Sequence, residues 1–401
     1  MKLKSLFQFI IVFIFALGLC LYFSSLFNFW GDLGSFSDTL VHYDLASFYS
    51  KFFPHINWWN TWGAGTPVIF FYPKTLYLFE TALRGLTHWD MQVIVFGILF
   101  ATIFLAGFFT ALAIKIVTKS WIISLTALPF FYGSPLLWEF RNYARCFAYL
   151  FLPITIFCLI WYLESPTKRK KIVLIITAGI SSIVHPFIGM LVLGTTFCFL
   201  INFRKIKDLI SIMVPIVFIS LAYYLPIRLL PGFKSELITS VFPFNINQIL
   251  YLTITPYSFV IALIGFFALI IFARKSLETF DKTILRGAVL TLSGLLIYFF
   301  TDAFYPKAFF YINGFPYYWA CIYMLPVLAI ITGISIKTLT KNLSRPFIWL
   351  AGFLVFLLLL ILAYYPLKNR IPILKMAPPI YGAAEMYPGI TWKYFENLFG
   401  P

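Results

Sequence analysis

Charged residues are scarce in this sequence of 401 residues. Asp, Glu, Lys and Arg together make up 11%, whereas apolar residues make up 61% and the mean hydropathy is +0.91. A soluble globular domain carries about a quarter of charged residues, so this chain has too few to cover its surface in water. The scarcity excludes a soluble globule and a disordered chain, and it predicts a protein that uses lipid as its solvent.

Cysteine is also rare, and the sequence lacks the common signatures of soluble enzymes. The five cysteines are widely separated and all lie in apolar stretches, which excludes a disulfide scaffold and predicts small buried side chains: Cys20, Cys146, Cys158, Cys198 and Cys321. No GxxxxGK phosphate loop, zinc-ligand spacing or Ser-His-Asp pattern is present.

Long uncharged apolar runs are what the chain has instead. A transmembrane helix needs about 20 mostly apolar residues. Runs of this kind lie at residues 5–30, 91–114, 120–138, 146–163, 209–227, 256–273, 287–301, 316–336 and 346–367. The run at 172–203 would extend about 48 Å as one helix, against a hydrocarbon core of about 30 Å, and a turn at His185-Pro186 would divide it.

The distribution of charge decides between one span and two in the run at 172–203. If this run is a hairpin and the N-terminus is cytoplasmic, 18 of the 30 Lys and Arg residues and 4 of the 14 acids lie on the cytoplasmic side. If the run is a single span, 15 Lys and Arg residues lie on each side of the membrane. The positive-inside rule therefore favours the hairpin. The net charge of +16 then indicates membrane orientation rather than a nucleic-acid partner.

The predicted fold is thus an all-α polytopic membrane protein with about eleven transmembrane helices. The transmembrane domain covers residues 1–367, and residues 368–401 form a short extracytoplasmic tail. The N-terminus is predicted to be cytoplasmic and the C-terminus extracytoplasmic.

The first extracytoplasmic loop, residues 31–90, is much longer than the other connections. It holds five of the 14 acids, three of the four histidines and four of the 11 tryptophans, and long ordered loops tend to be functional. Ser37 can cap a helix whose first turn contains Asp38; His42 then shares the face of Asp38, and Asp44 points about 120° away. The aromatic residues and glycines that follow predict an amphipathic element at the outer membrane interface, beneath a polar site.

Four short motifs in this loop carry a resemblance to a known superfamily. They are Asp-Thr-x-x-His from Asp38, then Trp-Asn, Gly-x-Gly-x-Pro and Phe-Tyr-Pro. Over residues 38–78 the chain resembles the GT-C membrane glycosyltransferases, and is most similar to prokaryotic 6-pyruvoyl-tetrahydropterin synthase-related membrane proteins and lipoteichoic-acid glycosylation membrane proteins. Two features depart from that pattern: Lys74 stands where a proline is common, and the late aromatic segment 315–319 lacks an arginine.

The resemblance implies an enzyme of the plasma membrane of a prokaryote. Such a hexosyl- or pentosyltransferase takes a sugar from a polyprenyl-phosphate donor and transfers it, with inversion, to an extracytoplasmic acceptor such as a glycan, a lipid or a protein. By resemblance the catalytic base is Asp38, and the supporting or alternative acids are His42, Asp44 and Asp32. The predicted partners are the lipid-linked sugar, its acceptor and membrane lipid, with no nucleic acid.

Cations beside the outer ends of predicted spans are candidates for binding the donor phosphate: Arg141, Arg145, His185 and Lys307. Arg141 and Arg145 stand four residues apart, and a guanidinium fork binds two phosphate oxygens. Simpler interpretations stay open. The arginines could snorkel at the interface, His185 could cap a helix break, and Asp38 could be an acid that stabilises a helix N-terminus.

Neither a cofactor nor the enzyme class follows from the residues alone. Asp38, His42 and Asp44 could hold Mg²⁺ or Mn²⁺, although Asp44 leaves the shared helix face. A transporter or lipid flippase usually carries ionisable groups within its spans, whereas the predicted spans contain no Asp, Glu, Lys or Arg. The missing late arginine also permits a non-catalytic scaffold with a GT-C fold.

Overall fold

The computed structural model describes residues 3–26, 46–51, 58–59, 66–67, 75–133, 137–138, 143–201, 206–228, 277–304 and 318–341, and single positions between 347 and 357. Within these residues four stretches are long and apolar enough to cross a membrane: Phe7–Ser25, Met91–Thr118, Cys146–Glu164 and Ile206–Tyr223. Ile188–Leu200 and Tyr323–Leu339 are shorter apolar helices. This is the helix composition of a membrane protein, whereas the count of eleven spans stays a prediction.

Helices make up almost all the regular structure of the described part of the chain. In order, the elements are α1 (Leu3–Leu26), β1 (Trp58–Trp59), β2 (Thr66–Pro67), α3 (Thr75–Thr87), α4 (Met91–Thr118), α5 (Trp121–Tyr132), α7 (Tyr143–Tyr149), α8 (Phe151–Glu164), α9 (Lys168–Val184), α10 (Pro186–Leu200), α11 (Ile206–Arg228), α14 (Thr279–Phe304) and α15 (Tyr318–Leu339). The antiparallel pair β1–β2, with Trp58 opposite Pro67, is a small departure from the all-α prediction.

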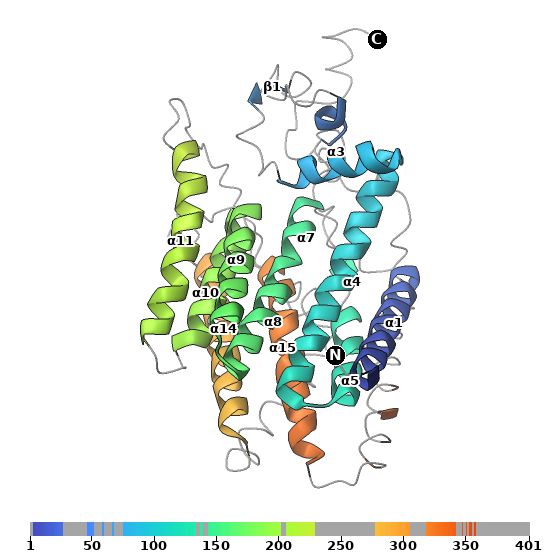
Figure 1. The fold of residues 1–401 in the computed structure, drawn as a ribbon, viewed down its shortest axis with the longest axis vertical. Coiled ribbons are helices and arrows are strands. Elements are labelled where there is room, and N and C mark those ends of the chain that lie inside the picture. Colours follow the sequence, from blue (N-terminus) through green and yellow to red (C-terminus); the bar gives the residue numbers. More distant parts are fainter. Residues whose placement is uncertain are drawn as a thin grey trace.

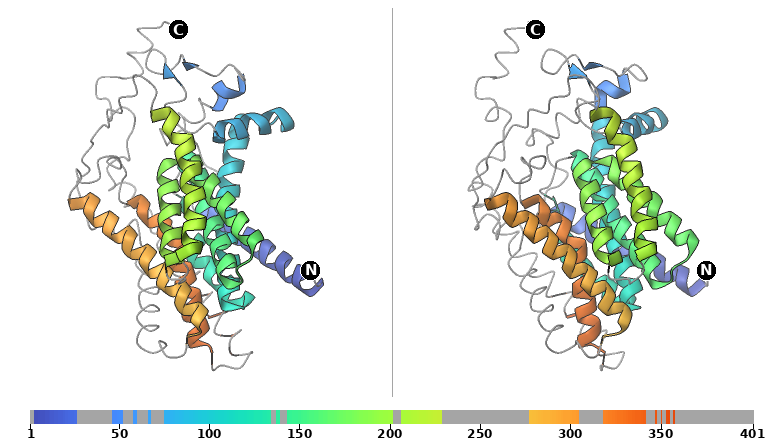
Figure 2. Two further views of the ribbon diagram at one scale, coloured as in Figure 1. Left: turned by 60° about the vertical axis from the view of Figure 1, so that its left-hand side comes forward. Right: turned by 90° about the vertical axis from the view of Figure 1, so that its left-hand side faces the viewer.

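Most helices run along the bundle, but α3 lies across one end of it (Figure 1). Turned views show α14 and α15 inclined against the remaining helices (Figure 2). The sequence predicted a helix near residues 40–53, of which residues 46–51 are described and are helical. The crosswise helix α3 is additional, and it covers part of this end of the bundle (Figure 1).

Within the run at 172–203, helices α9 and α10 form a hairpin, as the charge distribution predicts. α9 ends at Val184, His185 follows as its C-cap, and α10 begins at Pro186. Near the starts of α9 and α11, Lys171 Nζ lies 3.6 Å from Asp208 Oδ1. Farther along both helices, a Cβ on Gly179 would lie 2.7 Å from Ile219 Cδ1. α9 and α11 therefore run in the same direction, which requires the intervening α10 to return.

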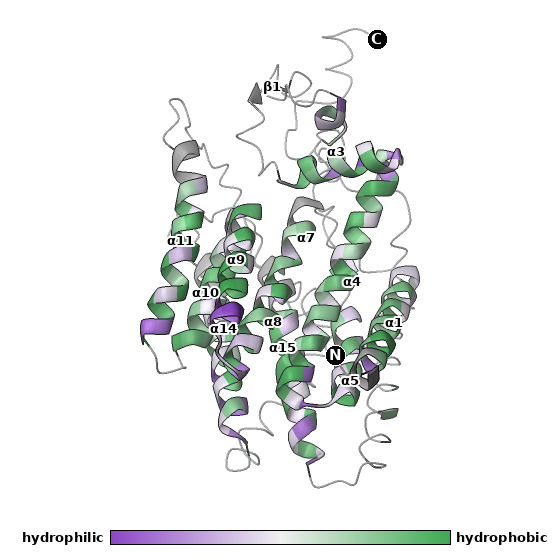
Figure 3. Ribbon diagram, in the orientation of Figure 1, coloured by the Kyte–Doolittle hydropathy of each residue, from purple (hydrophilic) through white to green (hydrophobic). Residues whose placement is uncertain are grey.

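In the described part of the chain, the helix ends next to the predicted cytoplasmic loops meet at one end of the bundle, called here the basic end. Four side-chain contacts join helix termini there: Lys119–Glu164, Lys171–Asp208, Lys337–Asp281 and Trp121–Gln8. Hydrophilic residues lie at the lower ends of α9, α11, α14 and α15, below largely apolar helix bodies (Figure 3). The predicted grouping of these loops is confirmed, and α3 lies at the opposite end (Figure 1). Which membrane face each end occupies stays a prediction.

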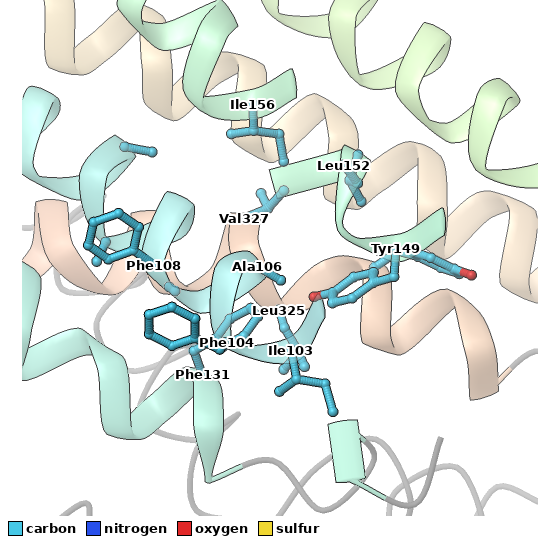
Figure 4. Packing of buried hydrophobic residues seen from close by; sticks show 14 of the residues in the cluster. Ile103, Phe104, Ala106, Phe108, Phe131, Tyr149, Leu152, Ile156, Leu325 and Val327 are labelled. Atoms are coloured by element: carbon cyan, nitrogen blue, oxygen red, sulfur yellow. The ribbon is translucent and has the colours of Figure 1, made fainter. Parts of the chain in front are cut away.

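The core is packed where α4, α5, α8 and α15 meet. Phe104 and Phe108 of α4 lie beside Phe131 of α5, and Leu325 and Val327 of α15 complete the cluster (Figure 4). All five side chains are buried. Close packing of this kind, rather than a hydrophobic driving force, holds helices together in lipid.

The α9–α10 hairpin is tight enough to test directly. A Cβ on Gly189 would lie 2.6 Å from Ser182 O and 2.8 Å from Ser182 Cα, which are backbone atoms that cannot move aside alone. Gly189→Ala is therefore expected to lower the free energy of unfolding by about 1–3 kcal/mol. Gly194→Ala, on the same helix with no atom within 4 Å, should instead be neutral or stabilising. Unfolding in detergent measures both, and equal effects would contradict the tight hairpin.

Candidate functional site

Most residues of the predicted site lie outside the described residues: Asp32, Asp38, His42, Asp44, Arg141 and Lys307. Arg145 lies on α7, of which the structure describes the backbone at this position but not the side chain. Of the predicted site side chains, the described residues therefore include only His185.

His185 separates α9 from α10 at the end of the bundle away from the basic end. Its backbone is extended, with φ −156° and ψ 128°, which ends α9, and its carbonyl accepts a hydrogen bond of 2.8 Å from Gly189 N. The predicted position at the tip of a hairpin is confirmed. The residue is only 4% exposed, however, so a phosphate could not reach it from bulk water without entering the protein.

Within the first loop, the helical residues 46–51 contact α3 at two places. The rings of Tyr49 and Tyr77 lie 5.2 Å apart, and both residues are fully buried. Arg84 Nη1 donates a hydrogen bond of 2.8 Å to Ser50 Oγ. Burial raises the pKa of the Tyr49 phenol, with a smaller contribution from Tyr223 of α11, so this hydroxyl is neutral at physiological pH.

Glu80 is a carboxylate that the sequence reasoning did not single out. It is 0% exposed on α3, three residues after Tyr77 and four before Arg84. Acids are almost never fully buried unless they are paired or hydrogen-bonded. The spacing of residues 77, 80 and 84, which places them on one face of a helix, could have indicated the burial of Glu80. It was missed because this segment was predicted only as part of a long loop.

A second buried acid lies at the basic end. Asp281 is 2% exposed in the first turn of α14, and its Oδ2 accepts a hydrogen bond of 2.7 Å from Lys337 Nζ of α15. Lys337 also donates to Val117 O of α4 at 3.2 Å and lies 3.8 Å from Glu278 Oε2. α14 starts at Thr279, before the apolar run predicted at 287–301, so this acid is built into the helix packing.

Burial raises the pKa of the Asp281 carboxyl, and the Lys337 ammonium opposes this shift without cancelling it. The free-energy cost of desolvating the carboxylate therefore outweighs the stabilisation from its pairing with Lys337. The pair joins α4, α14 and α15, but it is a poor source of net stability compared with apolar packing.

The last turn of α4 is the centre of the contacts at the basic end. Lys115 Nζ lies 5.3 Å from the centre of the Trp121 ring of α5, and Trp121 Nε1 donates to Gln8 Oε1 of α1 at 3.2 Å. Lys119, in the left-handed conformation with φ 59°, pairs with Glu164 of α8. Together with the Lys337–Val117 contact, these interactions join α5, α8 and α15 to the end of α4, and α1 is joined in turn to α5.

The described residues include no group of three His, Cys, Asp or Glu side chains that could hold a metal ion. The candidate metal ligands Asp38, His42 and Asp44 lie outside those residues, so a bound Mg²⁺ or Mn²⁺ stays a prediction.

No protein-family model matches this chain, and no curated protein is detectably similar to it in sequence. Its function is therefore inferred from the motifs of the first loop and from the arrangement of the two ends of the bundle.

Proposed function

We propose that the chain is an integral membrane glycosyltransferase that moves a sugar from a polyprenyl-phosphate donor to an extracytoplasmic acceptor. The proposal includes eleven spans, a cytoplasmic N-terminus and basic end, and the plasma membrane of a prokaryote. The acceptor is a glycan, a lipid or a protein, and Asp38 is the base.

The separation of the two ends of the bundle is the observation that supports the proposal best. Lysines and arginines gather at the basic end, while α3, which belongs to the acid-bearing first loop, covers the other end (Figure 1). A lipid-phosphate donor reacting outside the cytoplasm needs such a polar loop at the membrane surface. In the described part of the candidate spans, every Asp, Glu, Lys and Arg lies within about two turns of a helix end, which is unlike a transporter with charges at mid-membrane.

The proposed reaction needs one base and a set of cations. The Asp38 carboxylate accepts the proton of the acceptor hydroxyl as the hydroxyl oxygen bonds to the anomeric carbon from the face opposite the phosphate. The bond between that carbon and the phosphate oxygen breaks, and the polyprenyl phosphate leaves with the electron pair. Arg141, Arg145, His185 and Lys307 are the candidates that stabilise the departing phosphate.

Transfer by the purified protein in liposomes tests the proposal. Polyprenyl-phosphate hexoses and pentoses with a radiolabelled sugar would be supplied together with cell-envelope glycans and lipids as acceptors. Label in the acceptor fraction is expected with the protein and not with empty liposomes. Movement of labelled lipid across the bilayer without transfer would identify a flippase instead, and neither transfer nor binding of the donor would indicate a scaffold.

A further inference from the structure

Helices α9 and α11 lie side by side and both start at the basic end (Figure 1). Contacts at two levels fix their relative height. Near their starts, Lys171 Nζ of α9 lies 3.6 Å from Asp208 Oδ1 of α11, and it also donates a hydrogen bond to Ser211 Oγ. Farther along, Gly179 of α9 lies against Ile219 of α11. The first turns of the two helices therefore lie at about the same height.

Each of these two helices has a cation in its first turn, followed by three apolar residues at the same spacing. The four positions are Arg169, Ile172, Ile176 and Ile180 on α9, and Lys207, Ile210, Val214 and Phe218 on α11. Steps of three, four and four residues keep each set on one face of its helix. Both cations are exposed, and the apolar side chains are 42–70% exposed. Each helix thus presents an exposed apolar stripe with a positive charge at its head.

The two cations at the heads of the stripes are not engaged within the described part of the protein. Lys170 and Lys171, which follow Arg169, are engaged: Lys170 Nζ donates to Trp161 O at 2.8 Å, and Lys171 pairs with α11. Within the part of the chain that the structure describes, neither Arg169 nor Lys207 pairs with a carboxylate. Their charges are therefore available to an anion at the surface.

The positive-inside rule accounts for the number of bases at this end, but not for their position at the heads of two parallel apolar stripes. Acyl chains cover exposed apolar side chains in a membrane, and a cation at a helix end attracts the phosphate of an anionic lipid. Among the four candidate spans of the described residues, the one on α11 is the least buried, so its outer face is open to lipid. A soluble anion would leave the stripes uncovered, whereas a phospholipid covers both parts.

We propose that Arg169, Lys207 and the two apolar stripes form a binding site for an anionic phospholipid. The phosphate is held by the Arg169 guanidinium, whose fork binds two oxygens, and by the Lys207 ammonium. The acyl chains lie along the stripes, so the lipid bridges α9 and α11. The site lies at the basic end, opposite α3, and it does not depend on the proposed transferase activity.

Stabilisation by added lipid tests the site. Dioleoyl phosphatidylglycerol and dioleoyl phosphatidylcholine have the same chains and differ in net charge, and a ligand of the folded protein raises Tm as its concentration increases. Wild-type protein in detergent is expected to reach half of its maximal Tm shift at a phosphatidylglycerol concentration about 25-fold lower than that of phosphatidylcholine, or about fivefold for each cation. Arg169→Gln/Lys207→Gln should remove this preference and leave the response to phosphatidylcholine unchanged.

Lys282→Gln/Arg286→Gln on α14 is the matched control, because it removes the same charge near the same end of the bundle. Neither base pairs with a carboxylate among the described residues, and the exposed face beyond them is interrupted by Ser293 and Gly294. The control should keep the full preference for phosphatidylglycerol. An equal loss in the control and in the site variant would show a general effect of charge and overturn the site.

The single variants and a soluble anion complete the test. If the double variant is not recovered folded, Arg169→Gln and Lys207→Gln are each expected to lower the preference about fivefold. An unchanged preference in the site variants overturns the proposal. Glycerol 3-phosphate carries the anionic group without acyl chains, so it is expected to shift Tm much less than phosphatidylglycerol. An equal shift at the same concentration would assign the cations to a soluble anion and overturn the lipid site.

Discussion

Replacing Asp38 with Asn is expected to abolish sugar transfer while leaving the protein folded and able to bind its lipid donor. Asn has nearly the size and shape of Asp but cannot accept the proton of the acceptor hydroxyl. General-base catalysis contributes roughly 10²–10⁴ in rate, so kcat should fall by this factor and donor affinity should change little. Initial rates with a labelled polyprenyl-phosphate sugar, together with donor binding to each variant, measure the two effects separately.

Other acids of the first loop serve as comparisons for Asp38. Asp32→Asn and Asp44→Asn test the alternative bases and should retain most activity. Asp90→Asn should retain all of it, because this exposed side chain makes no capping hydrogen bond. A full rate in Asp38→Asn removes this residue from the mechanism, and a loss in Asp44→Asn or Asp32→Asn alone would assign the base there.

Breaking the buried pair at the basic end is expected to destabilise the protein more than removing both partners. Asp281→Val leaves the Lys337 ammonium without the carboxylate that lies 2.7 Å away, and losing one partner of a buried pair costs about 3–5 kcal/mol. Lys337→Met leaves the carboxylate at a position that is 2% exposed. The double variant should recover most of the loss, since burial already raises the pKa of Asp281 despite Lys337.

Unfolding of the four proteins in the same detergent gives the coupling between Asp281 and Lys337 as a double-mutant cycle. Glu164→Gln is the matched control, because its pair with Lys119 is exposed, with side-chain exposures of 31% and 58%. Such a pair contributes about 0–1 kcal/mol. Additive effects of the two single changes would show that the pair does not connect α14 and α15 as described.

The direction of the helices was predictable from charge, because lysines and arginines near short loops report orientation directly. Counting them predicted the hairpin at His185-Pro186, and the shared direction of α9 and α11 agrees with it. The common location of the basic loops followed from the same count. The hairpin and the common location of the basic loops both follow from the number and spacing of the lysines and arginines, which can be read directly from the sequence.

Helix ends and tertiary burial were less predictable. The run at 120–138 suggested one span, but α5 ends at Tyr132, whose carbonyl accepts a hydrogen bond from Trp138 Nε1. This side chain satisfies a carbonyl that a continuing helix would have paired with a backbone N–H. Likewise, a hydropathy profile gives no sign that the Glu80 side chain is fully buried on α3.

The α9–α10 hairpin is too short for an average membrane. Its arms have 17 and 15 residues, about 25 Å and 22 Å of helix, whereas the 28 residues of α4 extend about 42 Å. The hydrocarbon core is about 30 Å thick, so in the proposed topology the lipids beside the hairpin would thin to match its arms. In Figure 1 the upper end of α9 lies below the upper ends of α4 and α11. Under the proposed function, a long-chain carrier lipid would meet a lowered membrane surface there, and the thickness of the host bilayer is expected to change the transfer rate.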